Sequence, residues 1–387
     1  MTAVHSLLDP AATRARIPID RIEALAYEIP TDGPAGREAD GTLEWTSTTL
    51  VVTVVHADGI AGLGYTYGPA ACAALIEEKL ADVVLSCDPF AVRACWRSMM
   101  AAIRNAGRPG IGAMAVSALD VALWDLKARV LGAPLVDVLD RERDAVPVYG
   151  SGGFCNYSLD RLAGQLAAWV DEGIPRVKMK IGRQPEDDAA RLDAVRAAIG
   201  PEPELYLDAN GAFSRTQAGA WARRLRERWD VSWFEEPVSS DDLDGLRFVR
   251  GESPPGIDVA AGEYVYLLRD AEMLLAAEAV DCLQLDVTRC GGITGLLRAA
   301  GAADARSVEV SGHCAPQASA HALCAVPHLR HLEYFHDHVR IERTAFDGVL
   351  EPVGGALVHD PSRPGLGLEL RRGDLEPHCV YRGVVEG

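Results

Sequence analysis

The stretch Arg176-Val177-Lys178-Met179-Lys180-Ile181-Gly182 places two lysines on either side of one apolar residue. Residues two apart in a β-strand share one face, and in a barrel that face can point into the interior. Buried lysines are costly unless they have acidic partners or a use. Repulsion between them and desolvation both lower an ammonium pKa, so we expect one lysine to act as a base near neutral pH. The alternative is an exposed strand whose lysines meet water.

Short apolar segments alternate with helical patterns from Val146 onward. Apolar residues at helical spacing fill intervals at 159–172, 187–199, 216–228 and 295–305. Strands are predicted at 146–149, 176–181, 205–208, 231–234, 257–261, 282–285, 308–311 and 331–334. Eight strands alternating with helices predict an α/β fold, a closed parallel barrel whose chemistry lies at the carboxyl ends of the strands.

The residues before the barrel have a different pattern. β-Branched runs predict strands at 21–30 and 47–56, a third strand follows at 60–65, and helical patterns cover 70–85, 89–105 and 112–131. The intervening segment 30–44 is rich in Gly, Pro, Asp and Thr, which predicts a long mobile loop that could serve as a lid. We therefore predict an N-terminal α+β capping domain at 1–140, a barrel at 141–347, and a C-terminal segment at 348–387 that packs back on the cap.

Polar residues stand at the ends of seven consecutive predicted barrel strands. Any one of them is more simply explained as a helix cap or a surface ion pair. Seven in a row are hard to explain in that way, because the carboxyl ends of barrel strands converge on one mouth. These residues are Lys178, Lys180, Asp208, Asn210, Glu235, Glu236, Glu263, Asp286, His313 and Glu333.

Three of these residues, Asp208, Glu235 and Glu263, come from adjacent strands. Convergent carboxylates cannot all remain ionised without a positive counter-charge. Three carboxylates with no histidine among them suit Mg²⁺ better than Zn²⁺. The sequence therefore predicts a magnesium site with these three ligands.

Asp286 and His313 end neighbouring strands across the mouth. A carboxylate beside an imidazole fixes its tautomer and raises its basicity, as in a general base. The alternative is a hydrogen-bonded structural histidine. Histidines 321, 328, 331, 336 and 338 follow no comparable pattern and are interpreted as structural or surface groups, with His336 and His338 as candidate rim residues.

Composition limits the class of protein. The chain has 387 residues, enough for two domains, with 48% hydrophobic residues and a net charge of −18. That charge argues against nucleic acid and anionic membranes as partners, but a bound cation and two lysines would still accommodate a small anionic substrate. Nine cysteines without a CxxC pair are interpreted as reduced thiols in the cytoplasm. The segment 1–20 lacks the apolar core of a signal peptide, and no apolar run is long enough to span a membrane.

Several motifs resemble those of the enolase superfamily, specifically its mandelate racemase subgroup. They are the segment 115–129 (AVSALDVALWDLKAR), Leu207-Asp208-Ala209-Asn210-Gly211, Trp233-Phe234-Glu235-Glu236-Pro237, Ala261-Gly262-Glu263 and Cys290-Gly291-Gly292-Ile293-Thr294-Gly295. The resemblance covers nearly the whole chain and implies a modified (β/α)7β TIM barrel beneath a capping domain.

The resemblance also implies roles for individual residues. Asp208, Glu235 and Glu263 would hold Mg²⁺, to which the substrate carboxylate binds. Lys180 would be one base, and Lys178 would lower its pKa and contact the substrate. The Asp286–His313 pair would act on the opposite face of the carbon. Glu333 would hydrogen-bond the substrate carboxylate and stabilise an enediolate, and Asn210 is expected to bind substrate.

The implied chemistry is removal of a proton α to a carboxylate from a small carboxylate substrate. The leading prediction is dehydration of a sugar acid or diacid to a 2-keto-3-deoxy product. The alternatives are a racemase or epimerase of a 2-hydroxy acid and, more remotely, an inactive metal-binding barrel. Asp286 stands where the muconate cycloisomerase subgroup has a lysine, which argues against cycloisomerase, succinylbenzoate synthase and dipeptide epimerase activity. The resemblance also implies a homo-oligomer.

Overall fold

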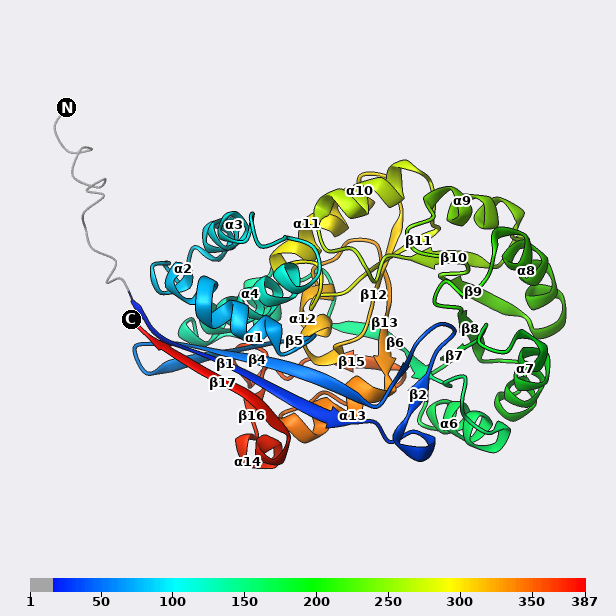
Figure 1. Cartoon of the computed structure of the whole chain (residues 1–387), viewed down its shortest axis with the longest axis horizontal. Helices are drawn as coiled ribbons and strands as arrows, with labels where there is room; N and C mark the ends of the chain where they lie inside the picture. The colour runs from blue at the N-terminus through cyan, green and yellow to red at the C-terminus, as the bar shows by residue number, and fades with distance from the viewer. Residues whose placement is uncertain (1–16) are drawn as a thin grey trace.

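The computed structural model of the chain describes residues 17–387 (Figure 1). The prediction that the opening segment lacks a signal peptide concerns residues that lie, up to residue 16, outside this range. Among the described residues, no helix combines the length and the apolar character needed to cross a membrane.

Eight parallel strands form a closed barrel, because β13 pairs with β6 as well as with β12. The order of the strands in the barrel follows their order in the chain, and every predicted strand is present. The observed strand ends differ from the predicted ends by at most two residues, except that β6 ends three residues later than predicted. The predicted α/β barrel is therefore confirmed. The strands are β6 (Ala145–Gly152), β7 (Arg176–Lys180), β8 (Glu204–Asp208), β9 (Val231–Glu235), β10 (Asp258–Ala261), β11 (Cys282–Leu285), β12 (Glu309–Gly312) and β13 (Leu329–Phe335).

Helices surround this barrel on the outside (Figure 1). In α6, the buried residues Leu162, Leu166 and Trp169 recur at helical spacing and face the strands. Ser214 and Gln217 cap the start of α8 reciprocally, which satisfies backbone N–H groups that the helix leaves free. The helices are α6 (Leu159–Asp171), α7 (Pro185–Ile199), α8 (Arg215–Trp229), α9 (Leu243–Glu252), α10 (Leu268–Ala276), α11 (Gly292–Asp304), α12 (Pro316–Leu323) and α13 (His336–Ala345).

Aromatic side chains fill the barrel interior one layer below the polar strand ends. Tyr206 and Trp233 stack with ring centroids 5.5 Å apart. The ring of His331 packs edge-on against both Tyr149 and Trp233. Each lies two residues before a polar residue of the same strand, so it faces the same interior. Burial lowers the pKa of His331 well below its usual value, which fits the structural role predicted for it.

The capping domain is built on an antiparallel sheet in the order β17-β1-β4-β5. Helix α4 packs directly on β5, where a Cβ on Gly64 would lie 2.1 Å from the Ala118 carbonyl oxygen. Only glycine permits this approach of helix and strand. The elements are β1 (Ile19–Pro30), β4 (Ser47–Ala57), β5 (Ile60–Tyr67), α1 (Ala71–Leu75), η2 (Ile76–Leu80), α2 (Ala81–Leu85), α3 (Val92–Ala102), α4 (Ile111–Val130), α5 (Leu135–Val138) and β17 (Cys379–Glu386).

The segment that precedes β17 runs along the barrel and the cap. Within it, β15 adds antiparallel to β6 outside the barrel circle, and β14 pairs with β16. The elements are β14 (Phe346–Asp347), β15 (Ala356–Val358), β16 (Glu369–Leu370), α14 (Arg372–Leu375) and η3 (Glu376–His378).

The predicted long loop is an ordered hairpin that lies against the barrel mouth. It contains η1 (Pro34–Gly36), β2 (Glu38–Ala39) and β3 (Glu44–Trp45), and both residues of β2 are fully buried. At its tip, a Cβ on Gly41 would lie 2.3 Å from the Ala209 carbonyl oxygen and 2.7 Å from that of Ile181. The segment is therefore packed on the ends of β7 and β8 and forms short strands, which the prediction of a long mobile loop did not include. We refer to residues 31–45 as the lid.

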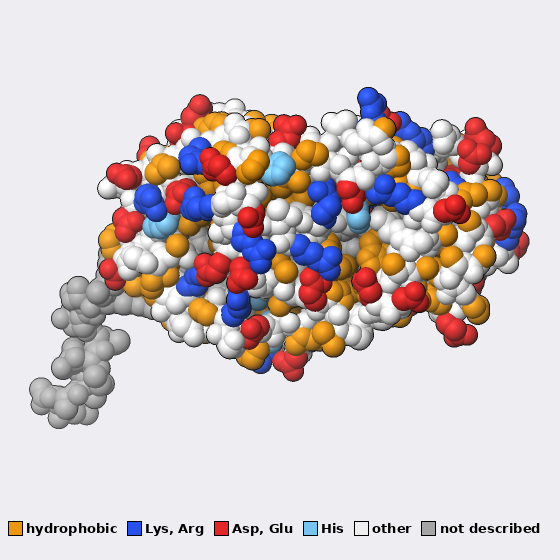
Figure 2. Space-filling view, turned by 90° about the horizontal axis from the view of Figure 1, so that it is seen from below, with side chains coloured by type: hydrophobic (Ala, Val, Ile, Leu, Met, Phe, Trp, Pro, Cys, Tyr) orange, Lys and Arg blue, Asp and Glu red, His pale blue; other side chains and the backbone are white. Residues whose placement is uncertain are grey.

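The cysteines differ in part from the prediction. Cys87 and Cys95 form a disulfide in the cap, so the expectation that all nine thiols are reduced is wrong for this pair. Cys87 lies just after α2 and Cys95 lies in the first turn of α3, a proximity that their spacing does not reveal. The other seven cysteines are free. On the surface, one face of the molecule carries interspersed acidic, basic and apolar side chains (Figure 2).

Candidate active site

Lys178 and Lys180 project from β7 into the barrel mouth, and both are buried. Lys178 Nζ lies 2.6 Å from Glu235 Oε1 and 2.8 Å from Glu333 Oε1, and Lys180 Nζ forms an ion pair with Asp208 Oδ2. Burial alone would lower both lysine pKa values, but these carboxylates raise them well above the usual range. The expected lowering of a lysine pKa is thus wrong for this arrangement, because attraction to the carboxylates exceeds repulsion between the ammonium groups.

The three predicted metal ligands lie together. Carboxylate oxygens of Asp208, Glu235 and Glu263 all fall within 4.8 Å of one another, and all three side chains are buried. Hard oxygen donors at this spacing fit a Mg²⁺ ion that retains positions for water and substrate. Glu236 follows Glu235 in the sequence, and its buried Oε1 has no hydrogen-bond partner among residues 17–387. Burial beside Glu263 and Asp208 raises the pKa of Glu236 well above the usual value.

The predicted Asp286–His313 pair is formed at the ends of β11 and β12. Asp286 Oδ2 lies 2.8 Å from His313 Nδ1, and Thr288 donates to Oδ1 of the same carboxylate through its N–H and its hydroxyl, both at 2.7 Å. The carboxylate is therefore fixed, and it leaves Nε2 of His313 directed at Glu263 Oε2, 3.2 Å away. Burial would lower the pKa of His313, but the neighbouring Cys314, Glu263, Glu333 and Asp286 raise it well above its usual value.

Glu333 connects the two halves of the site. Its Oε1 faces Lys178, whereas its Oε2 lies 3.5 Å from His313 Nε2. Burial would raise the pKa of Glu333, but Lys178, His313 and Lys180 lower it well below the usual range, so it accepts hydrogen bonds in this arrangement. Lys178 and the imidazole of His313 thus contact different oxygens of one carboxylate.

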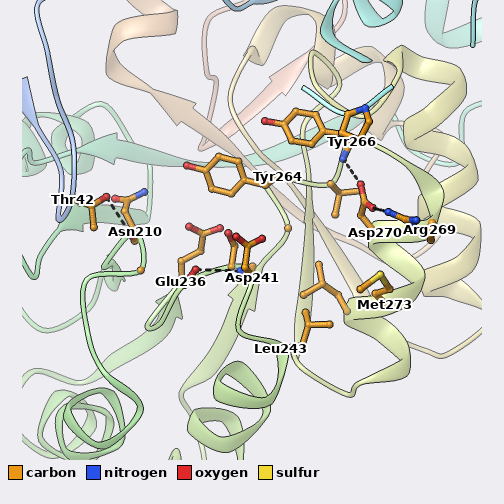
Figure 3. A pocket seen from close by; sticks show the side chains of 18 residues that line it. Thr42, Asn210, Glu236, Asp241, Leu243, Tyr264, Tyr266, Arg269, Asp270 and Met273 are labelled. Carbon is orange, nitrogen blue, oxygen red and sulfur yellow. Dashed lines mark hydrogen bonds and ion pairs between the residues drawn. The ribbon is translucent and has the colours of Figure 1, made fainter. Parts of the chain in front are cut away.

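A cavity of about 680 Å³ is lined by Glu236, Ala261 and Gly262, which are sequence neighbours of Glu235 and Glu263, but its lining does not include the three ligand carboxylates, Lys180 or His313. Asn210, the predicted substrate-binding residue, lines it and has a buried side-chain oxygen without a partner. Figure 3 shows Asn210, Glu236 and Tyr264 on one side of the cavity, and Leu243 and Met273 on the other. Polar groups supply much of the remaining lining, including Thr42, Ser239, Ser240, Asp241, Tyr266, Arg269 and Asp270.

Arg289 is a charged residue of the site that sequence reasoning missed. Its Nη1 lies 3.1 Å from Glu263 Oε1, and its Nε lies 3.5 Å from Asp286 Oδ2, so one guanidinium links a proposed metal ligand to the proposed dyad. The sequence signal that could have predicted this role is its position three residues after Asp286, because a turn that follows a barrel strand can place such a residue at the same barrel mouth. Cys314, beside His313, was missed as well.

The lid is held to the barrel by a cluster of acidic groups. Glu38 accepts from the Tyr157 hydroxyl at 3.0 Å, and Asp337 accepts from the lid residue Trp45 at 3.3 Å. Burial and the adjacent Asp337 raise the pKa of Glu38 to about 9. The other charged or titratable groups that face this pair are Asp32, Tyr157, Arg161, His336 and Arg340.

This cluster predicts that the lid loosens in alkali. Because the pKa of Glu38 is raised from 4.5, the docked lid favours the protonated form of this side chain. The contribution of Glu38 to the stability of the docked lid is therefore complete below pH 4.5 and is lost as the pH rises towards about 9. Hydrogen exchange in the lid, corrected for intrinsic rates, should increase between about pH 6 and pH 9. Glu38→Gln should remove that increase, whereas Glu44→Gln, on the exposed part of the same hairpin, should retain it. An increase of equal size in Glu38→Gln would contradict the assignment.

The proposed ligand set predicts the effect of Glu263→Gln. Removing one of three carboxylate charges should weaken Mg²⁺ binding by at least about tenfold, measured by titration calorimetry. Glu272→Gln, which removes a carboxylate from the surface helix α10, is the matched control and should bind Mg²⁺ as the parent does. Unchanged affinity in a folded Glu263→Gln variant would count against this ligand.

Two family models match the chain. One, described as "Mandelate racemase / muconate lactonizing enzyme, N-terminal domain", matches residues 38–140, and the other, "Enolase C-terminal domain-like", matches residues 161–374. The resemblance predicted from the motifs is confirmed by these matches.

Individual relatives are similar over most of their length. A 3,6-anhydro-alpha-L-galactonate cycloisomerase from Streptomyces coelicolor is 31% identical, over 91% of this chain and 97% of its own. L-talarate/galactarate dehydratase from Salmonella typhimurium is 32% identical over 84% of this chain and 81% of its own, and its crystal structure with Mg and L-lyxarohydroxamate superposes with a TM-score of 0.89. A mandelate racemase/muconate lactonizing enzyme-like protein from Rubrobacter xylanophilus is 54% identical, with a TM-score of 0.91 and coverage of 94% and 100%.

One relative bears on an activity that the sequence disfavours. The absence of a lysine from the sixth strand argues against cycloisomerase activity, yet a cycloisomerase is among the relatives of this chain. That lysine belongs to one subgroup, so its absence does not exclude the whole activity class. With its matched domains, its closed barrel and its converging strand ends, the chain belongs to the mandelate racemase/muconate lactonizing enzyme family of the enolase superfamily.

Proposed function

We propose that this protein is a Mg²⁺-dependent dehydratase that acts on a sugar acid or diacid and forms a 2-keto-3-deoxy product. The observation that carries the proposal is the placement of two proton-carrying groups, Lys180 and the Asp286–His313 pair, around one group of buried carboxylates. The dehydratases among its relatives support this activity.

The first step would be removal of the α-proton by Lys180. Asp208, Glu235 and Glu263 would hold Mg²⁺, which supplies positive charge to the substrate carboxylate as negative charge develops there. Lys178, fully buried between Glu235 and Glu333, adds a fixed positive charge on the same side. A cation held by Asp208 and Glu235 would weaken the attraction of these carboxylates for the lysines, which would favour the neutral Lys180 amine that accepts the proton.

The second step would be loss of the β-hydroxyl. His313 is held through Nδ1 by Asp286 and is charged in this environment, so its Nε2 can give a proton to the departing hydroxyl. The enol that results becomes the 2-keto-3-deoxy product by losing its O–H proton and gaining a proton at the β-carbon, Lys180 releases the α-proton to solvent, and His313 regains a proton from solvent. A single catalytic cycle therefore uses the lysine as base and the imidazole as acid.

The cavity supports a polyhydroxylated substrate. Hydroxyl and amide groups from Thr42, Asn210, Ser239 and Ser240 line it, with the acidic side chains of Asp241 and Asp270. Such groups can form hydrogen bonds with substrate hydroxyls. An apolar analogue would leave them without hydrogen bonds, which would weaken its binding. The lid contributes directly, since Thr42 also donates a hydrogen bond to the Asn210 carbonyl oxygen at 3.2 Å.

Two isomerase activities are the competing candidates. The same two proton carriers would epimerise a substrate if His313 returned the proton to the α-carbon, and the cycloisomerases among the relatives favour ring opening or closure without loss of water. An inactive metal-binding barrel is the remaining alternative.

Incubation with Mg²⁺ in D₂O against a panel of sugar acids, diacids, their lactones and 2-hydroxy acids tests the proposal. A 2-keto-3-deoxy product identified by NMR and mass spectrometry is the expected result. Deuterium at the α-carbon of an epimer would indicate an epimerase, and an isomer without water loss a cycloisomerase. No change with any compound, in a protein that binds Mg²⁺, would favour the inactive barrel.

We also propose a homo-oligomer and a cytoplasmic location. The edge strand β17 exposes Val380 and Val384, apolar side chains that a second chain could cover. Sedimentation analysis of the full chain tests the assembly, and fractionation of the cells that make the protein tests the location.

A further inference from the structure

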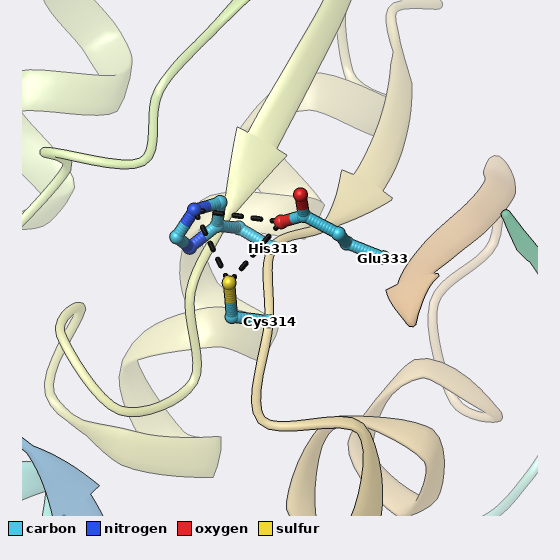
Figure 4. A group of neighbouring side chains, drawn as sticks. All are labelled: His313, Cys314 and Glu333. Carbon is cyan, nitrogen blue, oxygen red and sulfur yellow. Dashed lines mark hydrogen bonds and ion pairs between the residues drawn. The ribbon is translucent and has the colours of Figure 1, made fainter. Parts of the chain in front are cut away.

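Cys314 is a buried thiol at the centre of the site that the proposed reaction does not use. It follows His313 at the end of β12, and both Cys314 (φ 51°) and Ala315 (φ 44°) have left-handed backbone. That turn is held by hydrogen bonds from the Ala315 N–H to His338 Nδ1 at 3.1 Å and from the Ser319 hydroxyl to the Cys314 carbonyl oxygen at 2.9 Å. The strained turn directs the sulfur to the space between His313 and Glu333 (Figure 4).

The three side chains present a nitrogen, a sulfur and an oxygen at metal-ligand spacing. Cys314 Sγ lies 3.4 Å from His313 Nε2 and 3.2 Å from Glu333 Oε2, and the nitrogen and oxygen are 3.5 Å apart. Ligand atoms around tetrahedral Zn²⁺ are roughly 3.4 to 3.6 Å apart, given its usual bond lengths. The triangle therefore has nearly the size of one tetrahedral face, with a fourth position left for water or substrate.

Two of these ligands, His313 and Glu333, have the outer partners that zinc sites need, and the backbone turn positions Cys314. The Nδ1 atom of His313 bonds to Asp286, so Nε2 is the ring nitrogen that can face a metal, as in carboxylate–histidine–zinc arrangements; in this structure it contacts Glu263 Oε2 at 3.2 Å, a contact that a bound ion would replace. The second oxygen of Glu333 is held by the Ser151 hydroxyl at 2.5 Å and by Lys178 at 2.8 Å. The site thus has three ligands whose orientations are already fixed.

We propose that His313, Cys314 and Glu333 bind a thiophilic divalent cation, best matched by Zn²⁺, at a position distinct from the Asp208–Glu235–Glu263 group. Softer ligands select zinc or cadmium, whereas three carboxylates select magnesium. Binding releases the thiol proton, and any proton on Nε2, to solvent as the metal–sulfur and metal–nitrogen bonds form. If the proposed function holds, the ion also inhibits the enzyme, because it occupies the imidazole nitrogen that gives a proton to the leaving hydroxyl.

Cadmium binding tests the site without any activity measurement. The full-length protein in excess Mg²⁺ is titrated with Cd²⁺, and the ultraviolet absorption of a cadmium–thiolate bond is recorded, followed by displacement with Zn²⁺. We expect one saturable ion per chain. Cys314→Ser should lose the absorption, whereas Cys324→Ser, which alters another buried free thiol, should retain it. Thermal unfolding verifies that both variants are folded.

Absence of the absorption in the parent protein, or its persistence in folded Cys314→Ser, would overturn the proposal. Inhibition provides a second test once a substrate is known. The Zn²⁺ concentration that halves each variant's own rate should rise at least about tenfold in Cys314→Ser. Inhibition that excess Mg²⁺ relieves and that Cys314→Ser leaves unchanged would place the ion on the carboxylate group and overturn the inhibitory role. Failure of the proposed dehydration would leave the cadmium result unaffected, so the two failures are distinguishable.

Discussion

Replacing Lys180 by alanine is expected to lower kcat by about 10³-fold or more, because the proposed reaction starts with proton transfer to this amine. Affinity for Mg²⁺ should not fall, since the variant removes a cation that pairs with the proposed ligand Asp208. The measurement is turnover of a substrate found in the panel, together with calorimetric titration of Mg²⁺. α-Proton exchange with D₂O should disappear along with product.

Arg183→Ala is the matched control for Lys180→Ala. Arg183 is a cation just beyond the same strand, and it contacts the lid at Leu43 and Glu44 rather than the carboxylates. Its loss should leave kcat within about a few-fold of the parent, as expected for an exposed ion pair. If Lys180→Ala and Arg183→Ala lowered kcat by similar factors relative to the parent protein, Lys180 would not be the base.

His313→Asn is expected to lower the rate of dehydration by about 10²- to 10⁴-fold, because the variant lacks the acid that protonates the leaving hydroxyl. Its distinguishing result is that α-proton exchange should continue, because Lys180 and the metal ligands remain in place. The variant should therefore incorporate deuterium into unreacted substrate while it forms almost no product. NMR of the recovered substrate measures both quantities in one sample.

The control for this variant is His336→Asn, a histidine at the lid contact with Asp32 rather than in the dyad. It should retain product formation. Loss of exchange and product together in His313→Asn would mean that the imidazole, and not Lys180, removes the α-proton. Retention of both would exclude His313 from the reaction.

The barrel and the grouping of its strand ends were predictable because they depend on local patterns. Each strand alternates inward and outward, so that Tyr206 and Asp208, or Trp233 and Glu235, share one face as their spacing requires. Once eight such strands close, their last inward residues must meet. The family motifs added the roles of these residues, which spacing alone does not give.

The remaining features depend on contacts between distant parts of the chain. The lid contacts Tyr157 and Asp337, which lie far along the sequence from Glu38, so composition alone predicted a long loop without the strands of the hairpin. The lysine pKa values were misjudged because repulsion is visible within one strand, whereas the stronger attraction comes from carboxylates on other strands. The Cys87–Cys95 pair depends in the same way on the turn between two helices.

The place of β17 matters for the protein while it is being made. This strand pairs with β1, yet the ribosome delivers β1 near the start and β17 only after the complete barrel has been synthesised. One edge of the cap sheet is therefore unpaired throughout most of translation. Unpaired edges invite association with other chains. Nascent chains on one messenger RNA are therefore most prone to associate with one another before β17 is synthesised. Pairing of β17 with β1 then covers the exposed edge.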